Sequence, residues 1–265
     1  MTAIWEAYAI RFATMNARRA SQVFLGGLPA DMKEDAIWPF NFYVWCLKGP
    51  AGTIVIDTGA STATAAKRGF PLLRTVEEGL AAIGVDAGKV GTVLLTHLHW
   101  DHAGNPALFT GARFHMHRQE MNYVTGPAMR HAFLRGGYDS DEIGAIVRLV
   151  HDGRLTLHDS KSVTLAEGVI AHHVGGHTAG QMLVRVNTRR GWMVIANDSV
   201  AFREGRRRGL PFPTVYNVAD ALDAFDAARS LADAEDLVIP GHDPWVLSAH
   251  PPAGPGLDGI AHRLD

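Results

Sequence analysis

Short runs of β-branched and aromatic residues recur along the chain, most of them bounded by Gly, Pro or Asp. Such runs are typical of buried or half-buried strands. In the first half they predict strands over residues 8–14, 41–48, 53–57 and 93–96. In the second half they predict strands over residues 112–115, 163–165, 170–174, 182–186, 192–196 and 237–239.

Three other segments repeat their apolar residues at helical spacing. Residues 72–83 carry apolar side chains on one helical face and end before Gly84, which suits a helix C-terminus. Residues 141–150 and 219–231 show the same period, and we expect Leu222 to face the core. Strands dominate each half and helices close each half. This pattern predicts an α/β fold in which two sheets pack together with helices outside.

Composition changes this picture little. The chain has 265 residues, of which 47% are hydrophobic and 20% charged, as expected for one globular domain over residues 1–265. The net charge of −2 gives no electrostatic reason to expect nucleic acid or an anionic membrane as the main partner. The one dense basic run, residues 206–208, is flanked by glycine, and we interpret it as a solvated loop.

The chain has a single cysteine, Cys46, so no internal disulfide can form. It falls within a predicted strand, and we interpret it as a small core residue and not as a nucleophile. The N-terminus lacks a basic segment followed by an apolar run, and no stretch reaches 18 apolar residues. We therefore expect a cytoplasmic protein.

Metal-binding residue types cluster directly after the apolar run 93–96: His97, His99, Asp101 and His102. Residues two apart in an extended chain point to the same side, so His97 and His99 can reach one ion together. Asp101 and His102 follow after the chain turns and can reach a second ion close by. The chain has 14 histidines, but this density at a strand end is hard to explain by core packing.

Three further residues follow predicted strands and stand beside small residues: His177, Asp198 and His242. We assign the set to two ions, with one ion held by His97, His99 and His177, the other by Asp101, His102 and His242, and Asp198 bridging both. Imidazole and carboxylate ligands suit zinc, and also manganese, iron and cobalt. The sequence thus predicts two divalent ions per chain, with zinc the first choice.

Four segments resemble the metallo-β-lactamase superfamily and occur in that family's order: residues 96–104, 175–180, 197–199 and 240–244. Residues 56–59 resemble the family's early turn, in which Asp57 would support the metal ligands. The resemblance covers about residues 40–245. It implies a four-layer αββα sandwich of two mixed β-sheets with flanking helices.

The resemblance also narrows the reaction. A bridging carboxylate such as Asp198 is typical of the superfamily's lactonases and thioesterases, and true β-lactamases lack it. Only residues 243–265 follow His242, which leaves no room for the helical extension of glyoxalase II. The chain is most similar to the N-acyl-homoserine lactonase-like branch. One departure is that the tyrosine often found shortly after the bridging aspartate is missing from residues 198–202.

We therefore expect a dinuclear metal-dependent hydrolase that opens a lactone or related cyclic ester. Two cations that share a water lower its pKa, and the resulting hydroxide attacks the polarised carbonyl. Asp101 or Asp198 carries the proton. The spacing does not show whether Tyr123 or Tyr216 replaces the missing tyrosine.

Three alternatives stay open: a thioesterase like glyoxalase II, a mononuclear iron oxygenase of the same fold, and a binding module without catalysis. The intact set of seven metal-binding residues argues against the last two. As partners we expect a small lactone or ester, with neither nucleic acid nor membrane, and a homodimer is also open. The aromatic run 38–43 suits either core packing or a substrate rim.

Overall fold

The computed structural model describes residues 2–265, which contain two β-sheets. The larger sheet has the order β12-β1-β2-β3-β4-β5-β6, and its strands span Glu6–Met15 (β1), Phe40–Gly49 (β2), Gly52–Ile56 (β3), Thr92–Leu94 (β4), Arg113–His117 (β5), Leu155–His158 (β6) and Ala261–Arg263 (β12). The smaller sheet has the order β11-β10-β9-β8-β7, and its strands span Ser162–Ala166 (β7), Val169–His173 (β8), Met182–Thr188 (β9), Gly191–Asn197 (β10) and Val238–Pro240 (β11).

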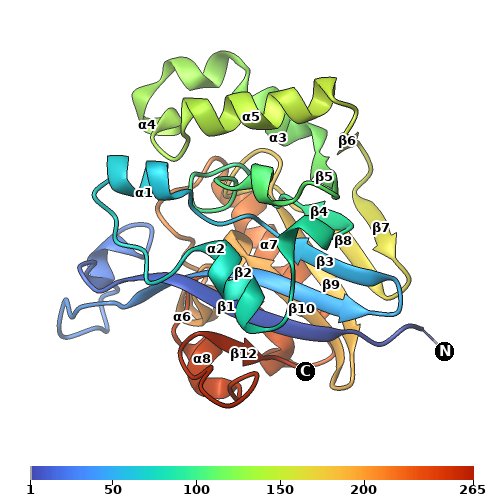
Figure 1. Ribbon diagram of the computed structural model, residues 1–265. Coiled ribbons are helices and arrows are strands. Elements are labelled where there is room, and N and C mark those ends of the chain that lie inside the picture. The colour runs from blue at the N-terminus through green and yellow to red at the C-terminus, as the bar shows by residue number, and fades with distance from the viewer. Residues whose placement is uncertain (1) are drawn as a thin grey trace.

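Both sheets are mixed, and helices cover their outer faces (Figure 1). Strands β3 to β6 run parallel, whereas β1 and β2 are antiparallel neighbours. The helices span Thr62–Lys67 (α1), Val76–Ala82 (α2), Arg118–Val124 (α3), Ala132–Arg135 (α4), Ser140–His151 (α5), Arg203–Arg208 (α6), Val218–Leu231 (α7) and Trp245–Ala249 (α8). The predicted four-layer αββα sandwich is confirmed.

Strand β2 shows why the layers form. Its residues are almost all apolar, so both of its faces must be covered. Phe42 and Val44 point into the core beneath the outer helices, whereas Tyr43 and Trp45 point between the two sheets. This alternation follows from the two-residue period of a strand. Cys46 is fully buried in the same core, as predicted.

The structure corrects three expectations. The predicted helix 72–83 begins only at Val76, because Thr75 and Glu78 form a capping box that fixes the helix start there. Leu222 is 38% exposed, because the buried face of α7 consists of Ala221, Ala224, Phe225 and Ala228. Residues 206–208 are not a loop, since they end helix α6, and Arg208 pairs with Asp31.

The strands also place the predicted metal-binding residues. The parallel strands β3 and β4 end side by side, as do β10 and β11, so the segments that follow them gather at one end of the sandwich (Figure 1). Ligand sites commonly form at such carboxyl ends of parallel strands. No helix within residues 2–265 is long and apolar enough to cross a membrane.

Candidate metal centre

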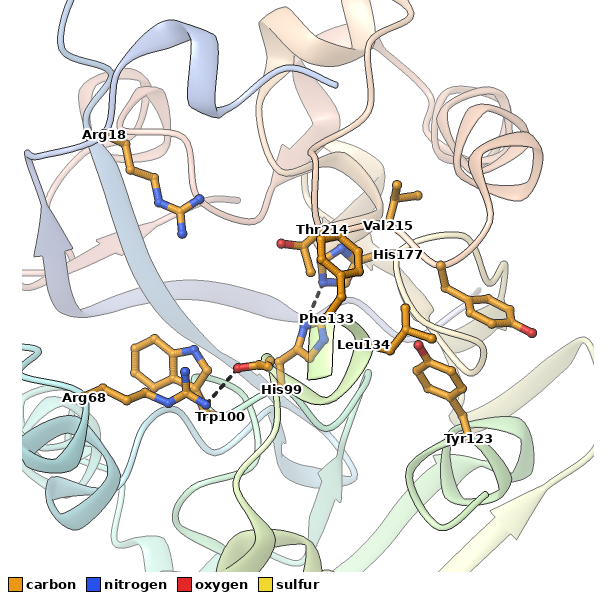
Figure 2. Close-up of a pocket in the computed structure, with 13 residues that line it drawn as sticks. Arg18, Arg68, His99, Trp100, Tyr123, Phe133, Leu134, His177, Thr214 and Val215 are labelled. Atoms are coloured by element: carbon orange, nitrogen blue, oxygen red, sulfur yellow. Dashed lines mark hydrogen bonds between the residues drawn. The ribbon is translucent and has the colours of Figure 1, made fainter. Parts of the chain in front are cut away.

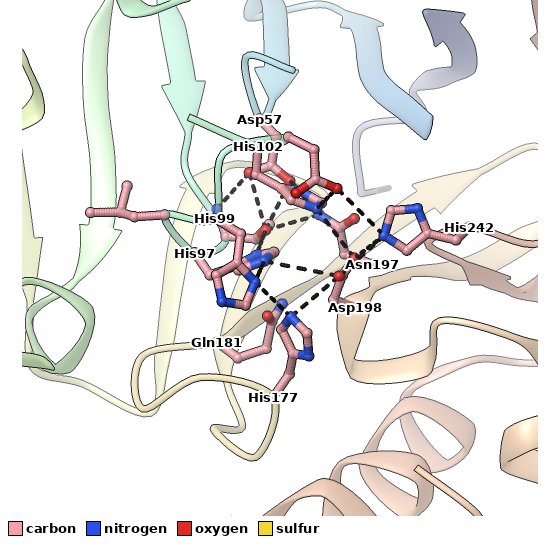
Figure 3. A network of polar contacts seen from close by, with 12 residues as sticks. Asp57, His97, His99, His102, His177, Gln181, Asn197, Asp198 and His242 are labelled. Atoms are coloured by element: carbon pink, nitrogen blue, oxygen red, sulfur yellow. Dashed lines mark hydrogen bonds and ion pairs between the residues drawn. The ribbon is translucent and has the colours of Figure 1, made fainter. Parts of the chain in front are cut away.

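All seven predicted metal-binding residues meet in one buried cluster, and Figure 3 labels all of them except Asp101. The segment 97–102 follows β4, and His177 lies in the turn between β8 and β9. Asp198 opens a short 3-10 helix after β10, and His242 follows β11. Strands of both sheets therefore present side chains to the same space, although the first and last of these residues, His97 and His242, are 145 residues apart along the chain.

The cluster divides into two groups whose donor atoms lie within 4.8 Å of one another: His97, His99, His177 and Asp198 in one, and Asp101, His102 and His242 in the other. In the first group, Nδ1 of His99 lies 3.1 Å from Nε2 of His97 and 2.9 Å from Nε2 of His177. In the second group, Oδ2 of Asp101 lies 3.3 Å from Nε2 of His102. The structure thus brings together the histidines and Asp101 in the two sets proposed from the sequence, with Asp198 counted in the first set.

Asp198 lies between the two groups. Its Oδ2 atom is 3.3 Å from Nε2 of His177, in the first group. Its Oδ1 atom is 3.4 Å from Nε2 of His102, in the second. Nε2 of His242, also in the second group, lies 3.0 Å from Oδ1 and 3.1 Å from Oδ2. A carboxylate that contacts both groups in this way has the geometry of a bridging ligand.

The second ring nitrogens of three histidines are engaged elsewhere. Nδ1 of His102 lies 2.8 Å from Oδ2 of Asp57, and Nδ1 of His242 lies 2.8 Å from the carbonyl oxygen of Asn41. Nδ1 of His97 lies 3.2 Å from Oγ1 of Thr96. Such contacts fix the ring orientation and leave Nε2 free to bind a metal. Nε2 of His102 is buried without any hydrogen-bond partner, as expected for an atom whose partner is an ion.

Most side chains of the cluster are already in the protonation state that binds a cation. Burial lowers the pKa values of His97, His99 and His177 below the ordinary range, so these rings are neutral near pH 7. Burial alone would raise the pKa of Asp198, but His242 and His102 outweigh it and hold that pKa well below its usual range. A neutral imidazole and an ionised carboxylate are the forms that bind divalent ions.

His102 differs from the other rings. Burial would lower its pKa, but the carboxylates of Asp101, Asp198 and Asp57 outweigh burial and raise the pKa well above the ordinary value. Without a cation, the imidazolium form of His102 balances part of the negative charge. The donor set and its charge therefore fit two divalent ions.

Two residues with positive φ support the cluster through hydrogen bonds. Asp57 has φ 63° and Asn197 has φ 50°, and no other non-glycine residue among 2–265 has positive φ. Asn197 Nδ2 donates a hydrogen bond to Oδ2 of Asp57, and the backbone N–H of Thr96 donates to Oδ1 at 2.7 Å. Strain of this kind persists only where the surrounding structure enforces it, and it concentrates at functional sites.

A further buried carboxylate, Glu120 at the start of α3, joins the two loops of the first group. It accepts hydrogen bonds from the backbone N–H of Leu98 through Oε1 and from that of Gly180 through Oε2, both at 3.0 Å. The hydroxyl of Tyr138 also donates to Oε1, at 3.3 Å. A Cβ at Gly180 would lie 2.3 Å from the Glu120 backbone nitrogen, so only glycine permits this approach.

We expect Glu120→Gln to weaken both the fold and metal binding. The glutamine amide group would face a backbone N–H, which leaves one buried donor unsatisfied and costs about 1–3 kcal/mol of unfolding free energy. Urea denaturation and a chelator-competition titration measure the two effects. Glu77→Gln, on the exposed face of α2, is the matched control. Unchanged metal affinity in Glu120→Gln would show that this contact does not position the histidines.

Two connected cavities open onto the cluster. The inner one, of about 80 Å³, is lined by Asp101, Asp198 and His242 together with Phe40 and Phe42. The outer one, of about 230 Å³, shares its wall of His99 and His177 with the inner one (Figure 2). The aromatic run 38–43 therefore contributes both to core packing and to the cavity wall, because Phe40 and Phe42 are buried and also line the inner cavity.

The tyrosines near the site take different positions. Tyr123 and Tyr216 line the outer cavity, with their ring centroids 4.8 Å apart. The ring of Tyr138 packs on His99 at 4.7 Å, but its hydroxyl is bound to Glu120. Within residues 2–265, the inner cavity is lined by no tyrosine, and Tyr123 and Tyr216 line only the outer one.

Sequence reasoning missed Glu120, Tyr138 and the role of Asn197. Asn197 stands beside the bridging aspartate, so its place in a family segment was the available signal. Glu120 follows β5 without any characteristic pattern. Only the folded chain shows that it lies between two distant loops.

Comparison with known proteins agrees with this geometry. The family model of the metallo-beta-lactamase superfamily matches residues 39–242, which include all seven residues of the cluster. The N-acyl homoserine lactonase AttM of Agrobacterium fabrum (strain C58) is 26% identical over 224 residues, which cover 78% of this chain and 82% of that protein. AttM of Rhizobium johnstonii is 25% identical over 228 residues, 79% of this chain and 84% of that protein.

Solved structures share the fold. An N-acyl homoserine lactone hydrolase with N-hexanoyl-L-homoserine bound at its catalytic metal centre superposes with a TM-score of 0.72 at 20% identity, over 94% of this chain and 97% of that one. AidC, a dizinc quorum-quenching lactonase, superposes with a TM-score of 0.69 at 16% identity, over 92% of this chain and 90% of that one. From its matched residues and its sandwich of two sheets, the chain belongs to the metallo-β-lactamase superfamily.

Proposed function

We propose that this protein is a dinuclear metal-dependent lactonase that opens a lactone or a related cyclic ester. The observation that carries the proposal is the position of Asp198, whose carboxylate contacts His177 of one group and both His102 and His242 of the other. A bridging carboxylate suits two ions that act together on one ester bond. The AttM relatives, named as N-acyl homoserine lactonases, support the lactone substrate.

We propose that the seven clustered residues hold the two ions, with zinc as the first choice among the metals that imidazole and carboxylate ligands suit. When bound, the ions would lower the pKa of a shared water and polarise the ester carbonyl. The chain itself supplies the apolar part of the inner cavity wall, chiefly Phe40 and Phe42, beside the polar side chains of the cluster.

Two carboxylates of the cluster are placed to move protons. Asp101 and Asp198 both line the inner cavity, where the reacting ester would lie. Burial would raise the pKa of Asp101, but His102 and His242 outweigh it, so the carboxyl is ionised and can accept a proton at neutral pH. We assign to Asp101 the transfer of that proton to the leaving alkoxide, with Asp198 as the alternative carrier.

A thioesterase of the glyoxalase II kind is the second candidate. Residues after His242 form the short helix α8 and the strand β12, which pairs with β1 at the edge of the larger sheet. Residues 243–265 contribute no side chain to the inner cavity. The AttM relatives, named as N-acyl homoserine lactonases, favour the lactone over the thioester.

Steady-state rates on four substrate classes test the choice: acyl-homoserine lactones, simple γ-lactones, aryl-fused lactones and acyl-glutathione thioesters. We expect a lactone to give the highest kcat/KM. If the thioester exceeds every lactone by more than tenfold, the thioesterase assignment replaces the lactonase.

Removal of metal is expected to abolish activity without unfolding the chain. Dialysis against a chelator should lower the metal content from about two ions per chain to none, because two groups of ligands are present. Zinc should then restore both the metal content and the rate. Activity that survives complete removal of metal, measured by elemental analysis, would contradict a metal-dependent mechanism.

A further inference from the structure

The outer cavity is positively charged. Its lining includes the guanidinium groups of Arg18 and Arg68 and contains no aspartate or glutamate. Arg18 also lines the inner cavity, so it stands where the two cavities meet. A wall of this kind attracts anions, and two divalent ions beneath it would strengthen the attraction.

Arg18 is held without use of its hydrogen-bond donors. Its guanidinium lies 5.3 Å from the ring centroid of Phe40 and 5.3 Å from that of Phe212, so two aromatic faces fix its position. Within residues 2–265 its side chain donates no hydrogen bond and forms no salt bridge. Burial lowers its pKa, and the nearby Asp101 opposes that change. A half-buried guanidinium with five free N–H groups is prepared to bind an external acceptor.

Arg68 stands on the same side of the cavity as Arg18, as Figure 2 shows. Its guanidinium lies 5.0 Å from the ring centroid of Trp100. One of its nitrogens donates to the carbonyl oxygens of Gly136 and Tyr138, both at 3.1 Å. Arg68 therefore fixes the loop over the site while its charge still faces the cavity.

The opposite side of the outer cavity is aromatic and apolar. Tyr123, Leu134 and Val215 lie there, across from the two arginines (Figure 2). The cavity thus has a cationic wall and an apolar wall, both beside the metal-facing His99 and His177. A neutral substrate with only an alkyl chain would leave the donors of Arg18 without a partner.

From these observations we infer that the substrate carries a carboxylate close to the ester that is cleaved, and that Arg18 binds this carboxylate. The inference rests on the proposed lactonase function and narrows its substrate class to anionic lactones. A guanidinium presents paired N–H groups that match the two oxygens of a carboxylate. Arg68 adds long-range attraction from the same wall.

A matched pair of substrates tests the inference. The lactone 5-oxotetrahydrofuran-2-carboxylate and its neutral carboxamide share ring, size and reacting bond, and differ in charge. In the zinc-loaded wild-type protein we expect kcat/KM to be about tenfold higher for the carboxylate, as one charge-assisted contact implies. In Arg18→Gln the two substrates should have about the same kcat/KM, whereas Arg18→Lys should retain part of the preference for the carboxylate.

Arg189→Gln is the control, because Arg189 is exposed in the turn between β9 and β10 and carries the same charge. It should keep the wild-type preference. If Arg18→Gln lowers kcat/KM equally for both lactones, Arg18 acts on the reacting carbonyl and the inference is wrong. If the wild-type protein prefers the carboxamide, the inference is also wrong, while the lactonase function stands.

Binding gives a readout independent of turnover. The lactam pyroglutamate and its amide have the same ring and the same pair of substituents, and calorimetry measures their affinities for zinc-loaded protein. We expect pyroglutamate to bind about tenfold more tightly than the amide, and Arg18→Gln to remove the difference. If the protein hydrolyses no lactone but keeps this difference, the proposed function fails and the carboxylate site remains. Equal affinities in the wild-type protein would overturn the inference itself.

Discussion

Asp198→Ala is expected to remove nearly all lactone hydrolysis and to lower the metal content from about two ions per chain to one or none. The carboxylate contacts histidines of both groups, so its loss takes a ligand from both. Residues that only orient a ligand typically contribute about 10–100-fold in affinity or activity. The loss of a bridging ligand should exceed that range.

Asp223→Ala is the matched control, since Asp223 lies on the exposed face of α7. Elemental analysis gives the metal content and steady-state kinetics gives the rate. Circular dichroism should show a folded protein in both variants, because Asp198 lies at the edge of a cavity and not in the apolar core. An Asp198→Ala protein with two ions and an unchanged rate would show that the bridge is wrongly assigned.

Asp57→Asn should have the second largest effect. Four groups from three residues, Thr96, His102 and Asn197, donate to the Asp57 carboxylate: the Thr96 N–H and hydroxyl, the His102 ring and the Asn197 amide. An asparagine amide would turn its own donor towards one of them. Asparagine tolerates the positive φ of this position, so the backbone conformation is not the cause of any loss.

We expect Asp57→Asn to weaken binding of the ion near His102 by about 10–100-fold, as for other residues that orient a ligand. Unfolding free energy should fall by about 1–3 kcal/mol for the unsatisfied buried donor. Chelator competition and urea denaturation measure these two quantities, with Asp223→Asn as control. If metal affinity stays at the wild-type value, the contact between Asp57 and His102 does not support the metal centre.

Much of the fold follows from local pattern. All ten predicted strands are present. An apolar run such as that of β2 is removed from water on both faces when it lies inside layered sheets. Strands β6 and β12 were missed, since they are short and contain charged or histidine residues. The start of α2 was misplaced because capping by Thr75 outweighs the apolar residue Leu72. That residues 1–265 form a single domain stays a prediction.

The candidate site was predictable for a different reason. The seven clustered residues follow strand ends and carry distinctive side chains, so both their position and their chemistry are visible in the sequence. Glu120 and Arg18 have no such pattern, because their roles depend on distant partners. Glu120 joins loops that belong to different sheets, and Arg18 is fixed by Phe40 and Phe212. Such residues become identifiable only when the tertiary contacts are known.

Anomalous diffraction from crystals of zinc-saturated protein tests the two-ion centre most directly. We predict two zinc peaks about 3.5 Å apart, the usual separation in two-metal hydrolytic sites. One ion should be bound by His97, His99 and His177, the other by Asp101, His102 and His242, and both by Asp198. A single peak, with His102 and His242 directed away from any ion, would contradict the account.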